Sequence, residues 1–388
     1  MTEYDIVLNG NVWDAQEGSR PDHWIAVRDR EIATVSPDCP GDAVVNREAN
    51  TILPGLCDMH VHLVWDGSGD PVTTLRADSE QQMTVRAVHN ANQQLRGGVT
   101  TVRDVGSVND IATTIARTIR NGWIEGPRVY ASGRSIIISG GHDPFWGIES
   151  DGLVECQRAV RQLRNAGAHL IKVSATGGVY GQAVGETPGA SELSPEELVA
   201  IVSEAHRFDM AVAAHAVGRE GIANAISAGV DTIEHGNQLD KVLIDELIDA
   251  DCTYDPTLFV YARIAQGDSS IPAYAQRNAQ QMYDQHTSAF QIALERDCQM
   301  VAGSDSGSPG VPQPGLHLEL QQMVTEGMSP AAALEAATLT AARELNRPEL
   351  GVIEPGTTAD LVCFNGDPRT NIEAVANPSC VIKDGKLI

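Results

Sequence analysis

The stretch 52–63 reads ILPGLCDMHVHL, an apolar run of strand length that ends in His60 and His62. Side chains at positions i and i+2 of a β-strand point to the same face, so the two imidazoles are expected to lie side by side. Neutral imidazole nitrogens are suitable ligands for a borderline metal ion such as zinc. The pair therefore indicates a metal site at a strand end, although two surface histidines beside a turn have the same spacing.

Apolar runs of strand length recur along the chain and alternate with longer amphipathic stretches. They are TILPGLCDM (51–59), VTTVRDV (99–105), RVYASG (128–133), AHLIKVSA (168–175), MAVAAHA (210–216), VDTIEHG (230–236), CTYDPTL (252–258) and QMVAGSD (299–305). Between them, the segment Ser194-Pro195-Glu196-Glu197 predicts a helix start with a capping serine and early acids. Strand–helix units in this number predict an α/β fold, a (β/α)8 TIM barrel, with an open doubly wound sheet as the alternative.

The two ends of the chain have a different pattern, with short β segments bounded by turn residues. The N-terminal part contains YDIVLNGNVWD and HWIAVRDREIATV, and the C-terminal part contains GTTADLVCFNG and PSCVIKDGKLI. We therefore expect residues 1–54 and 352–388 to form one small composite β-sandwich domain. Residues 55–351 are expected to form the barrel.

The composition excludes several classes of partner. The 388 residues include 27 Lys and Arg against 52 Asp and Glu, which gives a net charge of −25. Such a chain does not neutralise the phosphates of nucleic acid or of an anionic membrane. The N-terminus has no basic, apolar leader and no transmembrane run follows, so the expected location is cytoplasmic. The seven cysteines are dispersed and show no CxxC spacing, which argues against a disulfide framework or a thiolate metal site.

Three more candidate ligands lie at the ends of predicted barrel strands. His215 closes the run MAVAAH, His235 closes VDTIEH, and Asp305 follows MVAGS. Each of them alone could be a core or loop residue. Because catalytic groups of a TIM barrel lie at the carboxyl ends of its strands, the joint pattern favours a shared site.

Lys172 lies inside the apolar strand AHLIKVSA, in a chain that has only four lysines. Burial of an unpaired ammonium is costly. A neutral lysine amine can react with carbon dioxide to give a carbamate, which can bridge two cations, and arginine cannot lose its proton in this way. The alternative is a partly exposed lysine paired with an acid.

Taken in order, His60-Val61-His62, Lys172, His215, His235 and Asp305 resemble the binuclear branch of the amidohydrolase superfamily. The stretches GGVTTVRDVG, SGGHDP, IKVSATGGV, IEHGN and PGTTADLV resemble its imidazolonepropionase-like group, which includes metal-dependent Xaa-Pro dipeptidases. The resemblance runs nearly from end to end and implies a barrel with a composite β-sandwich.

The resemblance also implies roles for these residues. His60, His62 and Asp305 would hold the more buried of two divalent metal ions, and His215 and His235 the more exposed one. N-carboxylated Lys172 would bridge the two ions, which we expect to be zinc, with manganese, iron or cobalt as alternatives. A hydroxide shared by the ions would be the nucleophile, and Asp305 would transfer its proton to the leaving nitrogen.

Three residues are candidates for contact with the substrate. His142, in SGGHDP, would donate to the substrate carbonyl or the developing oxyanion, unless it is simply a turn histidine. Val217 stands where relatives that cleave dipeptides commonly carry tyrosine or histidine, and valine cannot hydrogen-bond a carboxylate. Tyr180 could take over this contact, with Tyr254 and Arg134 as further candidates.

The sequence thus predicts a metal-dependent hydrolase that cleaves amide C–N bonds of a small-molecule substrate, such as an Xaa-Pro dipeptide or an N-acyl amino acid. One alternative is a mononuclear deaminase or a hydrolase of cyclic amides, carbamates or ureas, built on His60, His62, His215 and Asp305. A second alternative is a non-catalytic scaffold on the same fold. A protein of that kind is expected to have lost some of the metal ligands. Assembly into a homo-oligomer stays open, because relatives often assemble.

Overall fold

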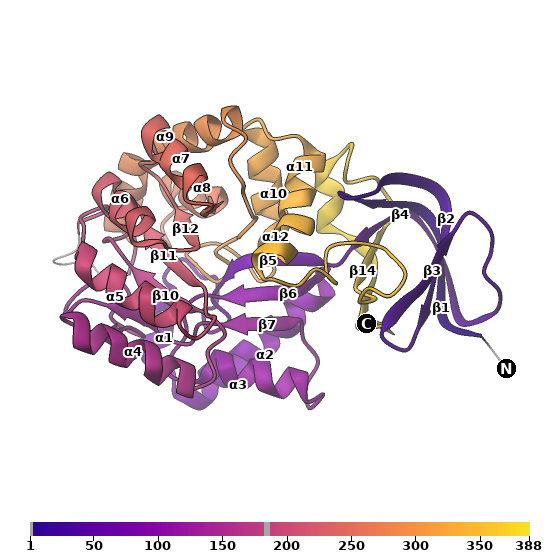
Figure 1. Cartoon of the computed structure of the whole chain (residues 1–388), viewed down its shortest axis with the longest axis horizontal. Helices are drawn as coiled ribbons and strands as arrows, with labels where there is room; N and C mark the ends of the chain where they lie inside the picture. Colours follow the sequence, from indigo (N-terminus) through magenta and orange to yellow (C-terminus); the bar gives the residue numbers. More distant parts are fainter. Residues whose placement is uncertain (1–2, 182–186) are drawn as a thin grey trace.

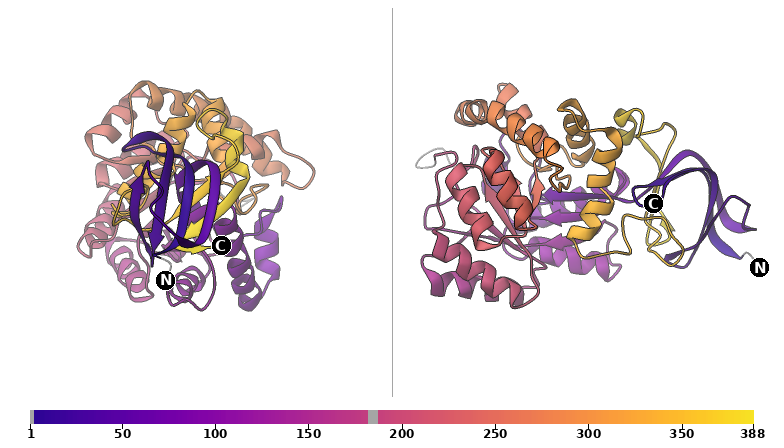
Figure 2. Two further views of the ribbon diagram at one scale, coloured as in Figure 1. Left: turned by 90° about the vertical axis from the view of Figure 1, so that its right-hand side faces the viewer. Right: turned by 45° about the horizontal axis from the view of Figure 1, so that its top comes forward.

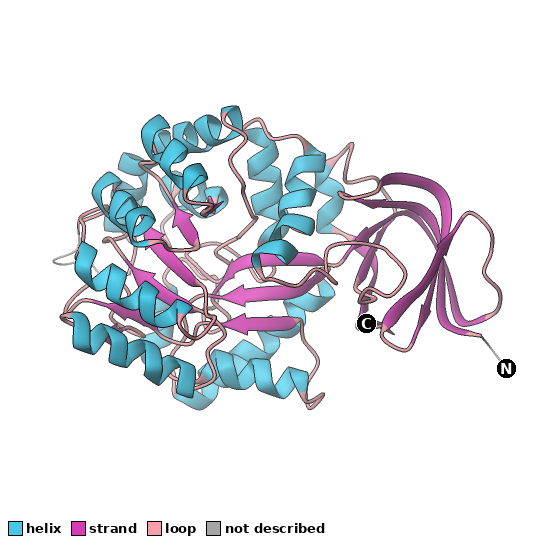
Figure 3. Cartoon of the chain, in the orientation of Figure 1, coloured by secondary structure: helices cyan, strands magenta, loops and turns pink. Residues whose placement is uncertain are grey.

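The computed structural model describes residues 3–181 and 187–388. Its central region holds parallel strands that are covered by helices (Figure 1; Figure 3). One sheet has the order β5-β6-β7 and the other has the order β13-β12-β11-β10-β8-β9. The bounds of these strands are β5 Leu56–Val61, β6 Val99–Asp104, β7 Arg128–Ala131, β8 Ser135–Ile137, β9 Ile148–Glu149, β10 Ile171–Ser174, β11 Val212–Ala216, β12 Thr232–His235 and β13 Thr253–Asp255.

The third predicted strand, 128–133, is shorter than expected, since it ends at Ala131. Gly133 has a φ of 70°, a left-handed conformation that glycine adopts without steric cost, and the strand resumes at Ser135 as β8. The first part, β7, pairs with β6, whereas β8 pairs with β10 through Ser135 and Lys172. The interruption therefore divides the parallel strands into two sheets.

The eighth predicted run, 299–305, connects the far edges of these two sheets. Met300 forms an isolated parallel bridge with Tyr254 of β13, and Ser306 forms one with Val61 of β5. The Asp305 N–H also donates to the carbonyl of His60 at 2.8 Å. The parallel strands, which alternate with helices along the chain, confirm the predicted α/β fold. The closed eight-stranded barrel stays a prediction, because the run is joined to its neighbours by single bridges.

The helices lie on the outside of the strands, and their starts follow ordinary capping rules. α5 begins after Ser194, whose hydroxyl accepts from the Glu197 N–H in a capping box, as the sequence predicts. None of the helices in the described ranges is long and apolar enough to cross a membrane. The helices are α1 Pro71–Ala77, α2 Glu80–Arg96, α3 Ile111–Arg120, α4 Leu153–Asn165, α5 Pro195–His206, α6 Arg219–Ala228, α7 Lys241–Asp249, α8 Leu258–Gln266, α9 Ala273–Glu295, α10 Leu316–Thr325, α11 Pro330–Ala336 and α12 Leu339–Glu344.

A seven-stranded sheet at one side of the molecule combines strands from both ends of the chain (Figure 2). Its order is β16-β15-β14-β4-β1-β2-β3, and β14 pairs antiparallel with β4. The bounds are β1 Tyr4–Asp14, β2 Gly18–Arg28, β3 Glu31–Ser36, β4 Ala43–Pro54, β14 Leu361–Phe364, β15 Pro378–Lys383 and β16 Lys386–Leu387. An apolar core of its own includes Leu8, Ile25 and Leu361. The sandwich layering and the predicted domain boundaries stay predictions.

The chain crosses from this sheet to the central strands at Gly55, between β4 and β5. A side chain is excluded here, because a Cβ on Gly55 would lie 2.1 Å from Thr100 Oγ1. Nearby, Arg128 of β7 donates to Asp360 at 2.9 Å and to Asp384 at 2.8 Å. Asp360 is only 5 % exposed, so its carboxylate depends on this guanidinium. Arg128 thus fastens the C-terminal strands to the central region.

We expect replacement of Arg128 by methionine to lower the free energy of unfolding by about 2–4 kcal/mol, because the buried carboxylate loses its counter-ion. Urea unfolding followed by circular dichroism measures the change. Arg28→Met is the matched control, because Arg28 and Glu3 form an exposed pair with 3.6 Å between their charged atoms. Its expected effect is below about 1 kcal/mol. Equal effects of the two substitutions would contradict the fastening role of Arg128.

Candidate metal centre

All six predicted metal ligands line one cavity, together with His142 and Tyr180. His60 lies in β5, Lys172 in β10, His215 in β11 and His235 at the end of β12. The remaining two, His62 and Asp305, directly follow β5 and the 299–304 segment. Side chains from distant parts of the sequence therefore meet at the carboxyl ends of parallel strands, where ligands of α/β proteins bind.

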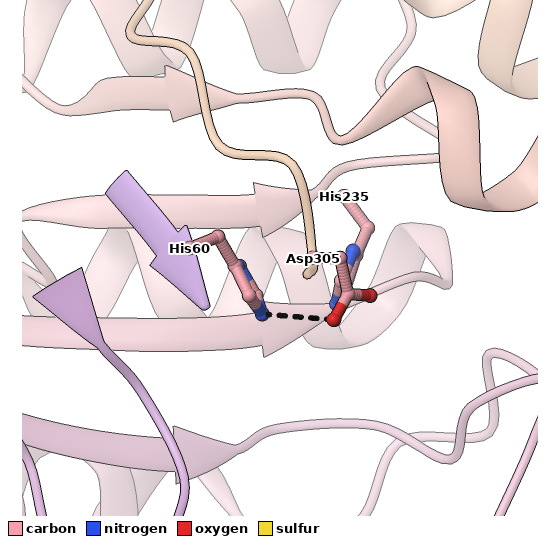
Figure 4. A group of neighbouring side chains, drawn as sticks. All are labelled: His60, His235 and Asp305. Atoms are coloured by element: carbon pink, nitrogen blue, oxygen red, sulfur yellow. Dashed lines mark ion pairs between the residues drawn. The ribbon is translucent and has the colours of Figure 1, made fainter. Parts of the chain in front are cut away.

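Nitrogen and oxygen atoms of this group lie close enough to share a cation. His60 Nε2 is 3.8 Å and His62 Nε2 is 3.3 Å from Asp305 Oδ1. One ligand atom from each of His60, His235 and Asp305 lies within 4.8 Å of the others (Figure 4). The rings of His215 and His235 are 4.7 Å apart, between centroids. The arrangement brings together nitrogen and carboxylate donors of the kind that zinc accepts.

The chemistry of the donors fits a divalent metal. His215 Nε2 is buried and has no hydrogen-bond partner among the described residues, which is costly unless something else uses its lone pair. Burial holds the pKa of His215 and of His235 well below the ordinary value, so both rings are neutral and able to bind a metal. Burial also lowers the pKa of Lys172, whose side chain is 2 % exposed. A lower pKa favours the neutral amine, which is the form that attacks carbon dioxide to give a carbamate.

Two of these residues have an unusual backbone conformation. His235 has a φ of 70° and Asp305 a φ of 54°, in the left-handed region that non-glycine residues rarely adopt. Such strain persists where the surrounding structure enforces it, and it is concentrated at functional sites. Both residues stand where a strand turns into a loop, so the conformation directs their side chains into the cavity.

Below the cavity lies a buried polar cluster that the sequence analysis missed. His60 Nδ1 donates to Glu234 Oε2 at 2.7 Å, and Arg103 Nη2 donates to Glu234 Oε1 at 2.7 Å. Because Nδ1 carries the donated proton, Nε2 of His60 is left free to face Asp305. A charged residue inside an apolar strand was the available clue, since VTTVRDV carries Arg103 as AHLIKVSA carries Lys172.

The same cluster contains a second set of donors, His60, Glu234 and Asp255. Burial raises the pKa of Asp255 well above its ordinary value, and the neighbouring Glu234 carboxylate raises it further. Arg103 Nη2 lies 3.3 Å from Asp255 Oδ2 and already supplies a positive charge. We therefore assign no metal to this second set.

The predicted substrate contacts differ in their placement. His142 stacks on His215 with 4.2 Å between ring centroids, and its Nε2 is 3.3 Å from Asp143 Oδ1. Tyr180 lines the cavity, but its hydroxyl donates to Asp70 at 2.6 Å. Val217 is fully buried and is absent from the described lining of the cavity. The structure therefore places His142, and not Val217, in the described lining of the cavity.

Replacement of Glu234 by glutamine is expected to weaken metal binding by about 10- to 100-fold, because His60 loses the carboxylate that orients its ring. Competition with a chromogenic chelator measures the affinity. The control is Glu246→Gln on the exposed face of α7, which we expect to bind metal as the wild type does. Unchanged affinity in a correctly folded Glu234→Gln protein would contradict the orienting role.

Comparison with known proteins extends these observations. The amidohydrolase family model matches residues 51–388. Ochratoxinase from Aspergillus niger is 30 % identical over 87 % of this chain and 75 % of its own length. Imidazolonepropionase from Geobacillus kaustophilus is 25 % identical over 100 % of this chain and 92 % of its own. The crystal structure of a Xaa-Pro dipeptidase with methionine bound in its active site superposes with a TM-score of 0.90 and 29 % identity, over 99 % of both chains.

Proposed function

The chain belongs to the amidohydrolase family and is a hydrolytic enzyme, and from that premise we propose that it cleaves the amide C–N bond of a small substrate with the help of two divalent metal ions. The observation that carries the proposal is the convergence of six donor residues in one cavity. The unpartnered, buried His215 Nε2 within that group supports a metal in particular. The names of the relatives, ochratoxinase and Xaa-Pro dipeptidase, agree with hydrolysis of amide bonds.

In this proposal His60, His62 and Asp305 hold the more buried ion, and His215 and His235 hold the other. Lys172, once carboxylated by carbon dioxide, would be the ligand that the two ions share, and zinc is the metal that we expect first. When bound, the ions supply polarisation of the scissile carbonyl and activation of water. The substrate class stays within the two groups that the sequence left open. These are dipeptides or N-acyl amino acids, and neutral amides, lactams, carbamates or ureas.

Asp305 is suited to move the proton. Burial alone raises the pKa of its carboxyl group, but the nearby His60 and the hydrogen bond from His62 outweigh that and hold the pKa well below its usual range. The side chain is therefore a carboxylate at neutral pH, and the Ser308 hydroxyl, which donates to Oδ1 at 2.6 Å, fixes its orientation. A carboxylate in this position accepts a proton from the attacking water and returns it to the leaving nitrogen.

His142 is suited to bind the substrate carbonyl. Its ring lies against His215 and lines the cavity, and its Nε2 faces Asp143. An imidazole N–H aimed at the carbonyl oxygen stabilises the negative charge that develops there during attack. His142 would thus contribute to the chemical step and not only to binding.

The two-ion site predicts a specific effect of removing Lys172. We expect the wild type to hold about two zinc equivalents and to lose amide hydrolysis after chelation, with recovery on addition of zinc. Lys172→Ala should retain one equivalent or fewer, with activity reduced at least 100-fold, as measured by metal analysis and amine release. Lys241→Ala, which removes an exposed lysine at the start of α7, is the control. Full metal content and activity in Lys172→Ala would contradict the role of Lys172 as a ligand shared by two ions.

Replacement of His142 by alanine is expected to lower kcat by about 100-fold, the usual effect of losing an oxyanion donor. Metal content should not change, because His142 is outside the ligand set. Steady-state kinetics on an amide substrate measure this, and His89→Ala on the exposed face of α2 is the control. A rise in KM with unchanged kcat would show that His142 acts in binding alone.

A further inference from the structure

We propose that this cavity selects an uncharged amide that carries an apolar group and discriminates against substrates with a free carboxylate. The inference rests on the proposed amide hydrolysis and names its substrate class. Outside the ligand set, the walls of the cavity are largely apolar. They include Trp65, Val179, Tyr180, Val260, Ile264 and Pro309. An apolar substituent is favoured against such a surface, because its burial removes apolar area from water.

The described lining of the cavity also offers no lysine or arginine outside the ligand set that could receive a carboxylate. Among its described lining residues, Lys172 is the single lysine or arginine, and it belongs to the ligand set. The segment 182–186, QAVGE, contains neither residue type. Burial of a carboxylate without a counter-charge carries a large desolvation cost. A substrate whose amide carbonyl faces the proposed metal ions would hold a free carboxylate against the other walls and meet that cost there.

Three arginines beside the lining segments already have other partners. Arg134 donates to the Trp146 carbonyl at 3.0 Å, and Arg86 donates to the Val64 carbonyl at 3.0 Å. Arg263 of α8 pairs with Asp268. None of the three is in the described lining of the cavity. Recruitment of any of them to a substrate would break an existing contact.

The tyrosines proposed from the sequence as carboxylate contacts are engaged as well. The Tyr180 hydroxyl donates to Asp70 and accepts from the Val72 N–H at 2.9 Å, which leaves its ring as the surface offered to the cavity. The Tyr254 hydroxyl donates to the His235 carbonyl at 2.9 Å. Both hydroxyl groups are thus already engaged within the protein.

A fixed carboxylate in the cavity adds repulsion. Asp143 lines the cavity, is 6 % exposed, and has a φ of 61°. Its carbonyl accepts from the N–H groups of Trp146 and Gly147, at 3.2 and 2.9 Å, so the turn holds the residue in place. In a site of low dielectric constant, this negative charge disfavours a second one. Asp143 therefore discriminates between neutral and anionic substrates.

The test is a matched pair of substrates, N-benzoylphenethylamine and N-benzoyl-L-phenylalanine, which differ only in the α-carboxylate. With the zinc-loaded enzyme, we expect kcat/KM for the neutral compound to be at least tenfold higher, as measured by release of benzoate. A preference for the anionic compound would overturn the inference and leave amide hydrolysis standing. Hydrolysis of neither compound, nor of any dipeptide, lactam or carbamate by protein with full metal content, would overturn the proposed function and the inference together.

Replacement of Asp143 by asparagine tests the effect of its charge on substrate preference with little change in the shape of the cavity. In Asp143→Asn, we expect the ratio of kcat/KM values to move at least threefold toward the anionic substrate, whatever the change in overall activity. Asp110→Asn is the control, because this carboxylate is exposed at the start of α3 and makes no side-chain capping bond. The ratio should stay at the wild-type value in the control. An unchanged ratio in Asp143→Asn would overturn the role assigned to Asp143.

Discussion

The guanidinium of Arg103 is the contact on which both the fold and the site depend. It is 3 % exposed, and it donates from β6 to the Met59 carbonyl of β5 at 2.6 Å, to Thr232 Oγ1 at 3.1 Å and to Glu234 at 2.7 Å in β12. It therefore joins strands from the beginning and the middle of the chain through the interior. A buried guanidinium cannot lose its proton, so these acceptors must stay in place.

Two separate sets of hydrogen bonds position the ligands around the cavity, and Arg103 belongs to the first of them. In the first, Arg103 holds Glu234, and Glu234 orients His60. In the second, the buried carboxylate of Asp58 accepts from the N–H and hydroxyl of Ser304, at 2.9 and 2.5 Å, and so holds the segment that carries Asp305 against β5. Asp58 is fully buried, and this burial raises the pKa of its carboxyl group to about 7. Ligands that lie far apart in the sequence are thus positioned by polar contacts beneath the site.

Much of this was predictable from the sequence, because strand periodicity and the order of apolar runs do not depend on distant contacts. The runs that end in His60, His215 and His235 form strands, and their terminal side chains meet in one cavity. The interruption at Gly133 was not predictable, because one glycine in a strand pattern is compatible with a continuous strand or with a break. The hydrogen bond between Tyr180 and Asp70 could not be predicted either, because the two residues lie 110 positions apart and no local pattern joins them.

The two buried basic residues of the parallel strands have different roles, which follow from their chemistry. Arg103 and Lys172 both lie in apolar runs, and both are almost inaccessible to water. Arg103 is paired with Glu234 and Asp255, whereas Lys172 forms no ion pair within residues 3–181 and 187–388. Arginine keeps its charge and needs such partners, but lysine can become neutral when it is buried. The arginine thus fixes the scaffold below the cavity, while the lysine, at the cavity surface, is available for a covalent change that turns an amine into a metal-binding carboxylate.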